Sequence, residues 1–134
     1  MSSWTVRKPQ TGEQVRVSRG KYFHYGICIA PEKIIHFATE NGDGFDDPSK
    51  ATVCETTLTA FAAGNFVECL ELTRTERAYT FTAEETANRA RASLGEKDYD
   101  VLTNNCRHFA NRCLYGNSEG PKEKLRGFLG TLKK

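Results

Sequence analysis

The first half of the chain alternates apolar and polar positions with a period of two, which is typical of β-strands. Val15 and Val17 alternate with Gln14 and Arg16, so residues 13–18 are predicted to form a half-buried strand. Residues 22–29 and 34–38 are rich in aromatic and β-branched side chains and flank a turn at 30–33, which predicts a β-hairpin. Further strands are expected at 51–57, 65–72 and 78–81, with a helical turn at 58–62 and an extended arm at 1–12.

The second half of the chain changes to a helical period. Thr82 and Glu85 form a capping box, and Gly95 marks the end of a helix whose predicted inner stripe is Ala83, Ala87, Ala90 and Leu94. A second helix is predicted from Cys106, with Asn104 and Asn105 as capping residues and Gly116 as its stop. Its apolar positions are Cys106, Phe109, Ala110, Cys113 and Leu114. The predicted fold class is therefore α+β, an antiparallel sheet packed against helices.

The length, charge and cysteine content of the chain exclude several classes of protein. At 134 residues the chain is long enough for one domain with a proper core, and its net charge of +2 does not indicate a nucleic-acid partner. No run reaches the ~18 apolar residues of a membrane span. The five cysteines are odd in number and form no C-x-x-C pair, so we interpret them as reduced thiols in a cytoplasmic-type compartment. No metal site or other cofactor is expected.

Two segments between and after these elements are polar. Residues 39–50 are a polar loop of the kind that is often functional or mobile, and its acidic residues Asp43, Asp46 and Asp47 do not fit a calcium-loop pattern, so we interpret them as solvated. Residues 117–134 form a basic tail in which four apolar residues recur with helical spacing. Its segment 122–134 is predicted either to contact an anionic membrane peripherally or to fold back on the domain.

Cys106 is the candidate for chemistry. In the first turn of a helix, the positive end of the helix dipole favours a thiolate, and we expect a lowered thiol pKa. The alternative is a buried cysteine that acts as a small hydrophobe, and a suitable histidine decides between the two. His24 and His36 lie on opposite strands of the predicted hairpin. With an odd loop, for example with Ile29 opposite Lys33, His36 lies opposite Gly26 and the imidazoles share a face; with an even loop they lie on opposite faces.

Three motifs together resemble a known family. They are His24-Tyr25-Gly26-Ile27, Ile34-Ile35-His36-Phe37 and Asn104-Asn105-Cys106-Arg107-His108-Phe109. These resemble the H-box and NC-box of the lecithin:retinol acyltransferase family, which includes the small phospholipase/acyltransferases and the H-box/NC proteins of picornaviruses. The resemblance covers about residues 12–116. It implies a circularly permuted papain-like fold of the NlpC type, within a chain divided into an arm (1–12), the domain (13–116) and the tail (117–134).

The resemblance also implies site residues and a reaction. Cys106 would be the nucleophile, His24 the base that takes its proton, and His36 the group that orients His24. The family transfers an acyl chain from a phospholipid to this cysteine as a thioester, and then to an alcohol, an amine or water. The sequence leaves the acyl donor, the acceptor and the oligomeric state undetermined.

This chain departs from the family in two ways. Arg107 replaces the usual acidic residue after the nucleophile, where an inward-pointing guanidinium would favour the thiolate. The hydrophobic anchor of membrane-embedded members is missing. His108 matches the family motif and is interpreted as structural. The alternatives to an acyltransferase or phospholipase-like enzyme are a non-catalytic interaction module, as among viral H-box/NC proteins, and a cysteine protease or amidase.

Overall fold

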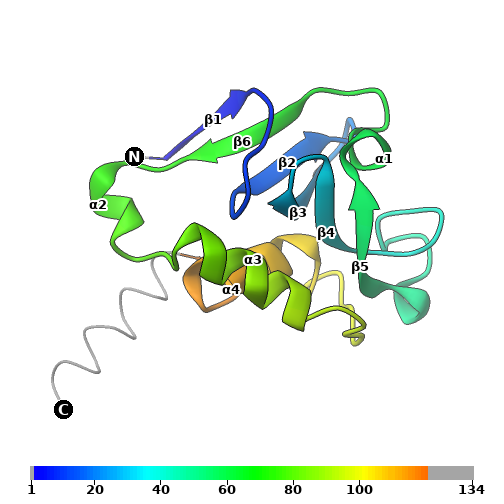
Figure 1. The fold of residues 1–134 in the computed structure, drawn as a ribbon. Coiled ribbons are helices and arrows are strands. Elements are labelled where there is room, and N and C mark those ends of the chain that lie inside the picture. The colour runs from blue at the N-terminus through cyan, green and yellow to red at the C-terminus, as the bar shows by residue number, and fades with distance from the viewer. Residues whose placement is uncertain (1, 121–134) are drawn as a thin grey trace, which may run out of the picture.

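The computed structural model describes residues 2–120, which fold into one antiparallel six-stranded sheet with helices on both faces (Figure 1). The strand order is β1-β6-β2-β3-β4-β5. The strands are β1 (Ser3–Val6), β2 (Gln14–Ser18), β3 (Phe23–Ala30), β4 (Lys33–Ala38), β5 (Thr52–Thr57) and β6 (Val67–Glu71). The helices are the 3-10 turn η1 (Pro48–Lys50), α1 (Leu58–Ala62), α2 (Arg74–Arg77), α3 (Ala83–Ala92) and α4 (Cys106–Tyr115). The predicted α+β class with an antiparallel sheet is confirmed.

The hairpin of β3 and β4 is the centre of the molecule and is buried on both faces. Gly26 pairs with His36, as the odd-loop register requires. The turn itself is even, because Ala30 pairs with Lys33, and a β-bulge between Cys28 and Ala30 restores the odd offset. The bulge therefore places both imidazoles on one face of the sheet.

The two faces of the sheet carry different cores. Helices α3 and α4 lie side by side beneath it in Figure 1 and cover a cluster that includes Tyr25, Ile27 and Phe37. The other face holds a second cluster in which Phe61 of α1 packs with Val17 and Ile34. Because side chains alternate along a strand, His24 and His36 point to the α1 face, opposite the face on which α4 packs.

At the edges of the sheet the structure differs in part from the prediction. Within residues 1–12, for which an extended arm was expected, β1 pairs with β6 as an edge strand, and Trp4 packs edge-on against Tyr25 with ring centroids 6.0 Å apart. One aromatic residue in a short polar segment gives no period-two signal. No strand forms at 78–81; these residues follow α2, which begins with a Thr73–Glu76 capping box. Phe66, expected in a mostly buried strand at 65–72, is 79% exposed just before β6.

The stripe of α3 also differs from the prediction. The Thr82–Glu85 capping box is present, and Ala87 and Ala90 are buried. The helix ends at Ala92, so Leu94 lies beyond the last turn and is 45% exposed, and the predicted inner residue Ala83 is exposed as well, whereas Thr86 is buried. The predicted membrane contact at 122–134 lies outside the described residues.

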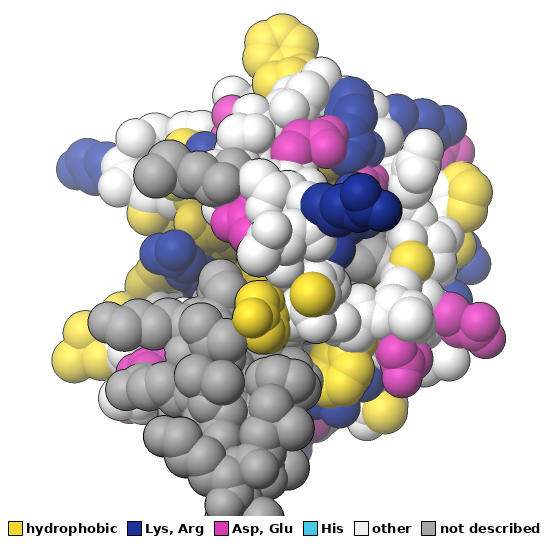
Figure 2. All heavy atoms as spheres, turned by 90° about the vertical axis from the view of Figure 1, so that its left-hand side faces the viewer, with side chains coloured by type: hydrophobic (Ala, Val, Ile, Leu, Met, Phe, Trp, Pro, Cys, Tyr) yellow, Lys and Arg dark blue, Asp and Glu magenta, His cyan; other side chains and the backbone are white. Residues whose placement is uncertain are grey.

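Acidic and basic side chains are interspersed over the face of the molecule drawn in Figure 2, with hydrophobic side chains between them. No histidine is visible on that face, in keeping with the burial of His24 and His36. None of the helices between residues 2 and 120 is long and apolar enough to cross a bilayer.

Candidate active site

The helix that carries Cys106 is capped by its own motif. Asn105 is the N-cap residue, and its side-chain oxygen accepts hydrogen bonds from the backbone N–H groups of Arg107 (3.0 Å) and His108 (3.2 Å). The Nδ1 atom of His108 in turn accepts from the Asn105 backbone N–H at 3.0 Å. His108 thus completes a capping box, which agrees with the structural role expected of it. The cap fixes Cys106 as the first residue of α4.

The Cys106 thiol reaches the end of the β3–β4 ladder from the α4 side. Pairing between these strands extends to Gly26 and His36 and does not continue to Tyr25. The backbone N–H of Tyr25 instead faces the Cys106 sulfur and acts to lower the pKa of the thiol. The thiol therefore lies next to the strand residue that follows His24.

Burial has a larger effect on the pKa of this thiol than the helix N-terminus. Cys106 is only 3% exposed, and burial raises its pKa to about 11, although the backbone N–H groups of Tyr25, Arg107 and Cys106 itself act in the opposite direction. The negative charge of Asp43 raises the pKa further. The expected lowering of the thiol pKa is therefore wrong for this conformation, because the site excludes water that would solvate a thiolate.

His24 and His36 form a buried hydrogen-bonded pair. His24 Nε2 lies 2.8 Å from His36 Nδ1, which confirms that the imidazoles share a face. The ring of Phe61 packs against both, with centroids 5.3 Å from His24 and 5.8 Å from His36. Burial lowers the pKa of His24 to about 3 and that of His36 to about 4, so both rings are neutral at pH 7.

One nitrogen of this pair has no partner. His24 Nδ1 is buried and makes no hydrogen bond among the described residues, and so it does not hydrogen-bond to the Cys106 thiol in this conformation. Contacts between a catalytic base and its nucleophile are often loose without a ligand and tighten when substrate binds. The assignment of Cys106, His24 and His36 as catalytic residues stays a prediction.

Asp43 was missed by the sequence analysis. Its Oδ2 atom accepts hydrogen bonds from Arg19 Nε and from the Tyr22 hydroxyl, each at 2.8 Å, and its Oδ1 atom lies 3.5 Å from His24 Nε2. The side chain of Asp43 is only 11% exposed, so the interpretation of this residue as solvated is wrong. Three acidic residues in a polar loop give no signal that separates the inward one from the others.

The loop that carries Asp43 packs over Tyr99, which shares a buried cluster with Cys106, and we interpret this loop as the cover of the site. Phe45 packs on Tyr22 with ring centroids 4.8 Å apart and on Tyr99 at 6.2 Å. Gly44 lies so close to the Tyr99 ring that a Cβ atom there would be 2.7 Å from it. His24 is fully buried and Cys106 nearly so, and a substrate carbonyl can reach the thiol only if this cover moves.

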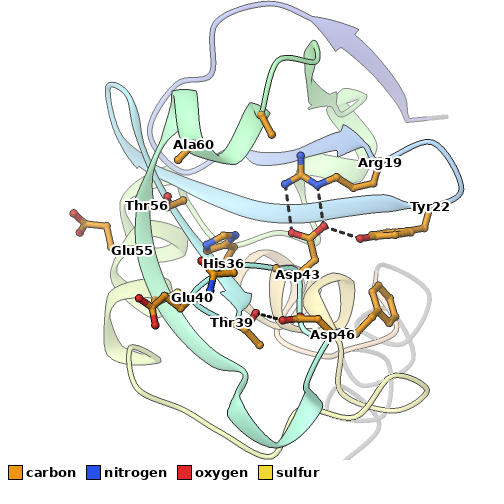
Figure 3. Close-up of a pocket in the computed structure, with 15 residues that line it drawn as sticks. Arg19, Tyr22, His36, Thr39, Glu40, Asp43, Asp46, Glu55, Thr56 and Ala60 are labelled. Carbon is orange, nitrogen blue, oxygen red and sulfur yellow. Dashed lines mark hydrogen bonds and ion pairs between the residues drawn. The ribbon is translucent and has the colours of Figure 1, made fainter.

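A polar cavity of about 660 Å³ opens on the other side of the histidine pair (Figure 3). His36 forms part of its wall, and Asp43 with its partners Arg19 and Tyr22 forms another part, whereas Cys106 does not line it. The carboxylates of Glu40 and Glu55 are also in its lining. The cavity therefore meets the candidate site at His36 and Asp43.

Arg107 does not contribute the expected charge. Its side chain is exposed, and its guanidinium carbon lies 5.5 Å from the centre of the Tyr25 ring. Of Arg107, only the backbone N–H acts on the pKa of the Cys106 thiol. Among residues 2–120, no group of three or more histidine, cysteine or acidic side chains is arranged to hold a metal ion.

A cysteine at a helix N-terminus and a buried pair of hydrogen-bonded histidines are the kinds of residue that cysteine-dependent enzymes use. The family model for lecithin retinol acyltransferase matches residues 7–119, and the chain belongs to that family. The predicted resemblance is confirmed.

Named relatives agree with this assignment. The chain is 27% identical to lecithin retinol acyltransferase of Mus musculus over 141 residues, an alignment that covers 91% of this chain and 60% of the relative. It is 28% identical to phospholipase A and acyltransferase 1 of Rattus norvegicus, covering 92% of this chain and 77% of the relative. For phospholipase A and acyltransferase 2 of Homo sapiens the identity is 25%, with 93% and 81% covered. The chain thus spans about three fifths of the lecithin retinol acyltransferases it matches.

Proposed function

We propose that this protein is a thiol acyltransferase or phospholipase-like hydrolase that takes an acyl chain from a phospholipid onto Cys106. The Cys106 sulfur attacks the ester carbonyl carbon while its proton passes to His24. Collapse of the tetrahedral intermediate breaks the ester C–O bond, and the His24 proton goes to the leaving alkoxide. The products of this half-reaction are a Cys106 thioester and a lysophospholipid.

The second half-reaction releases the acyl chain. Water or an alcohol or amine acceptor attacks the thioester, gives its proton to His24 and releases the thiol, which regains that proton. Each half-reaction returns His24 to its neutral form, so the imidazole needs only to carry one proton in transit. His36 holds the ring of His24 in place during both transfers.

The observation that carries this proposal is the free nitrogen of His24. In a chain of an acyltransferase family, a buried imidazole is held at Nε2 by His36, and its Nδ1 has no partner among the described residues. The next residue in the chain, Tyr25, directs its backbone N–H at the Cys106 sulfur. A buried nitrogen without a hydrogen bond costs free energy, about 1–3 kcal/mol, and a proton-accepting role accounts for retaining it.

The neutral resting state is compatible with this chemistry. Burial disfavours an isolated thiolate and an isolated imidazolium, but transfer of a proton from Cys106 to His24 creates both at once as an adjacent ion pair. The net charge of the site does not change in that step. Substrate binding that brings the sulfur and Nδ1 together would therefore activate the nucleophile only when an acyl donor is present.

Intact mass spectrometry tests the proposal. The full chain is incubated with phosphatidylcholine vesicles, and a gain of one acyl chain is expected. Cys106→Ala should abolish this adduct, whereas Cys113→Ala, a buried cysteine of the same helix, should leave it in place. His24→Gln should prevent its formation even though the thiol is present.

An unmodified wild-type chain that also releases no free fatty acid or lysophospholipid, with phosphatidylcholine and with phosphatidylethanolamine, would refute the proposal. That result would favour the non-catalytic interaction module. Adduct formation in both cysteine variants would place the acyl group elsewhere and would refute the role of Cys106.

A further inference from the structure

The bond between the two histidines can run in either direction. Each neutral imidazole has one donor and one acceptor nitrogen, so His24 Nε2–H can donate to His36 Nδ1, or His36 Nδ1–H can donate to His24 Nε2. In the first case Nδ1 of His24 is bare. In the second case Nδ1 carries the ring proton and has no lone pair with which to accept another. A histidine in the orienting position therefore does not by itself fix which nitrogen of His24 is the base.

Asp43 removes this ambiguity by its position. Its Oδ1 atom lies 3.5 Å from the same nitrogen, Nε2 of His24, in a site where the imidazole is fully buried. A carboxylate can only accept a hydrogen bond, and its negative charge favours a proton on the nitrogen that it faces. Both neighbours of Nε2 then act as acceptors, His36 at 2.8 Å and Asp43 at 3.5 Å.

Asp43 is held in its charged form by its other contacts. Burial raises the pKa of Asp43, but the hydrogen bonds from Arg19 and Tyr22 and the charge of Arg19 outweigh this, so that its pKa lies below the ordinary value. Arg19 Nε donates to Oδ2 at 2.8 Å and Arg19 Nη2 to Oδ1 at 3.4 Å. Figure 3 shows these contacts on the wall of the cavity, with the Tyr22 hydroxyl on the other side of the carboxylate.

We propose that Asp43 is a positioning residue that selects the Nε2–H tautomer of His24 and so leaves Nδ1 bare as the proton acceptor. The proposal rests on the proposed function for the role of His24 as base. It accounts for two facts that the histidine pair leaves unexplained. Nδ1 of His24 has no partner, and a loop carboxylate is buried against the opposite nitrogen.

The charged and titratable groups around His24 act in opposing directions. His36 of β4 and Arg19, which follows β2, disfavour an imidazolium at His24, whereas Asp43 favours it; Phe61 of α1 is apolar. When His24 takes the Cys106 proton, Asp43 is the anion that faces the resulting imidazolium. Asp43 therefore selects the neutral tautomer before the transfer and stabilises the charged ring after it.

Nitrogen NMR of the full chain labelled with ¹⁵N-histidine tests the tautomer directly. The chain has three histidines, so single His→Gln variants assign the signals. In the wild type we expect His24 Nε2 to have the shift of a protonated ring nitrogen and Nδ1 that of a bare one. In Asp43→Asn the carboxylate is replaced by a group that can also donate, and both nitrogens should move to intermediate shifts as the tautomers mix. Asp43→Glu should restore the wild-type pattern at least in part.

Two variants separate tautomer selection from loss of the loop. Tyr22→Phe removes one hydrogen bond to Asp43 but keeps the carboxylate, and Asp46→Asn removes a carboxylate of the same loop that binds Thr39 instead of a histidine. Both should keep the wild-type His24 signals. In acyl transfer, Asp43→Asn should lower kcat at least about tenfold, because part of the protein carries the proton on the wrong nitrogen.

The proposal is overturned if wild-type His24 carries its proton on Nδ1, if Asp43→Asn leaves the shifts unchanged, or if Tyr22→Phe and Asp46→Asn change them as much as Asp43→Asn does. None of these readouts needs turnover. A chain that shows the expected tautomers but forms no thioester would refute the proposed function alone.

Discussion

Phe45 is expected to hold the cover over Cys106 closed. Its ring packs between Tyr22 and Tyr99, at 4.8 and 6.2 Å between centroids. An aromatic pair is worth about 0.5–1.5 kcal/mol beyond the area it buries, and Phe45 is still 41% exposed, so Phe45→Ala should weaken the closed state by about 1–2 kcal/mol. That free energy corresponds to a roughly 5–30-fold larger open population.

Alkylation with iodoacetamide under native conditions measures this population. When the loop opens and closes faster than the reagent reacts, the alkylation rate of Cys106 is proportional to the open fraction, and it should rise by the same roughly 5–30-fold factor in Phe45→Ala. Peptide mass spectrometry follows each thiol separately. Cys54, which lines the cavity, reports a reachable thiol, and Cys113 on α4, which is 2% exposed, reports unfolding of the helix core.

Phe66→Ala is the matched control. It removes a phenylalanine that is 79% exposed next to β6, away from Tyr22 and Tyr99, and should leave the Cys106 rate unchanged. The reasoning is refuted if Phe45→Ala does not accelerate Cys106, or if Cys113 accelerates in parallel, since the opening would then be global rather than local. It is also refuted if wild-type Cys106 reacts as fast as Cys54.

Three further outcomes are expected from the same structure. His24 and His36 have pKa values lowered to about 3 and about 4 from 6.5, so the unfolded chain binds more protons than the folded one below pH 6.5. The contribution of the two histidines to the free energy of unfolding should be fully present above that pH and should fall as the pH drops toward 4. In urea titrations, a His24→Gln/His36→Gln chain should lose less of its free energy of unfolding over this pH range than the wild type. In Gly26→Ala the new Cβ would lie 2.7 Å from Ile34 and 3.1 Å from Phe61, and this overpacking should lower the free energy of unfolding by about 1–3 kcal/mol; a loss under 0.5 kcal/mol, again by urea denaturation, would contradict it. The basic segment 122–134 lies outside the described residues, and its membrane contact stays a prediction. Co-sedimentation of the full chain with anionic vesicles should weaken as the salt concentration rises and should be lost in a chain ending at Gly120. Equal binding by both chains would rule out this segment as the membrane contact.

The sequence predicts the middle of this fold better than its edges. Residues 14–18, 23–30 and 33–38 carry their β-strand signal locally, because each buries side chains in a period-two pattern. The strand β1 and the exposure of Phe66 depend on which segment reaches the free edge of the sheet, and that is decided by tertiary pairing. The bulge that puts both imidazoles on one face is likewise invisible in the pattern, since odd and even turns fit the same residues.

The candidate site divides in the same way. Cys106, with its cap at Asn105, could be found from the sequence because a helix N-terminus has a local signature. Its acidity could not, because a dipole argument takes no account of the burial that raises the thiol pKa to about 11. Asp43 could not be found either. Its role depends on Arg19 and Tyr22, some 20 residues earlier in the chain, and on a loop conformation that turns one of three similar acids inward.

The candidate site combines a closed loop, a neutral thiol and imidazole, and the proposed selection of the His24 tautomer by Asp43. A buried thiol with a raised pKa and a buried neutral imidazole are both poor reactants separately, which protects Cys106 from oxidants and other electrophiles while the loop is closed. The same loop carries Asp43, which faces His24 in this closed conformation and is hydrogen-bonded to Arg19 and Tyr22. Displacing the loop to admit an acyl donor would therefore also release the carboxylate that fixes the base. For the acyl transfer proposed above, we therefore expect the loop to close again over the bound acyl chain, so that access to the thiol and competence of the base would alternate within each cycle.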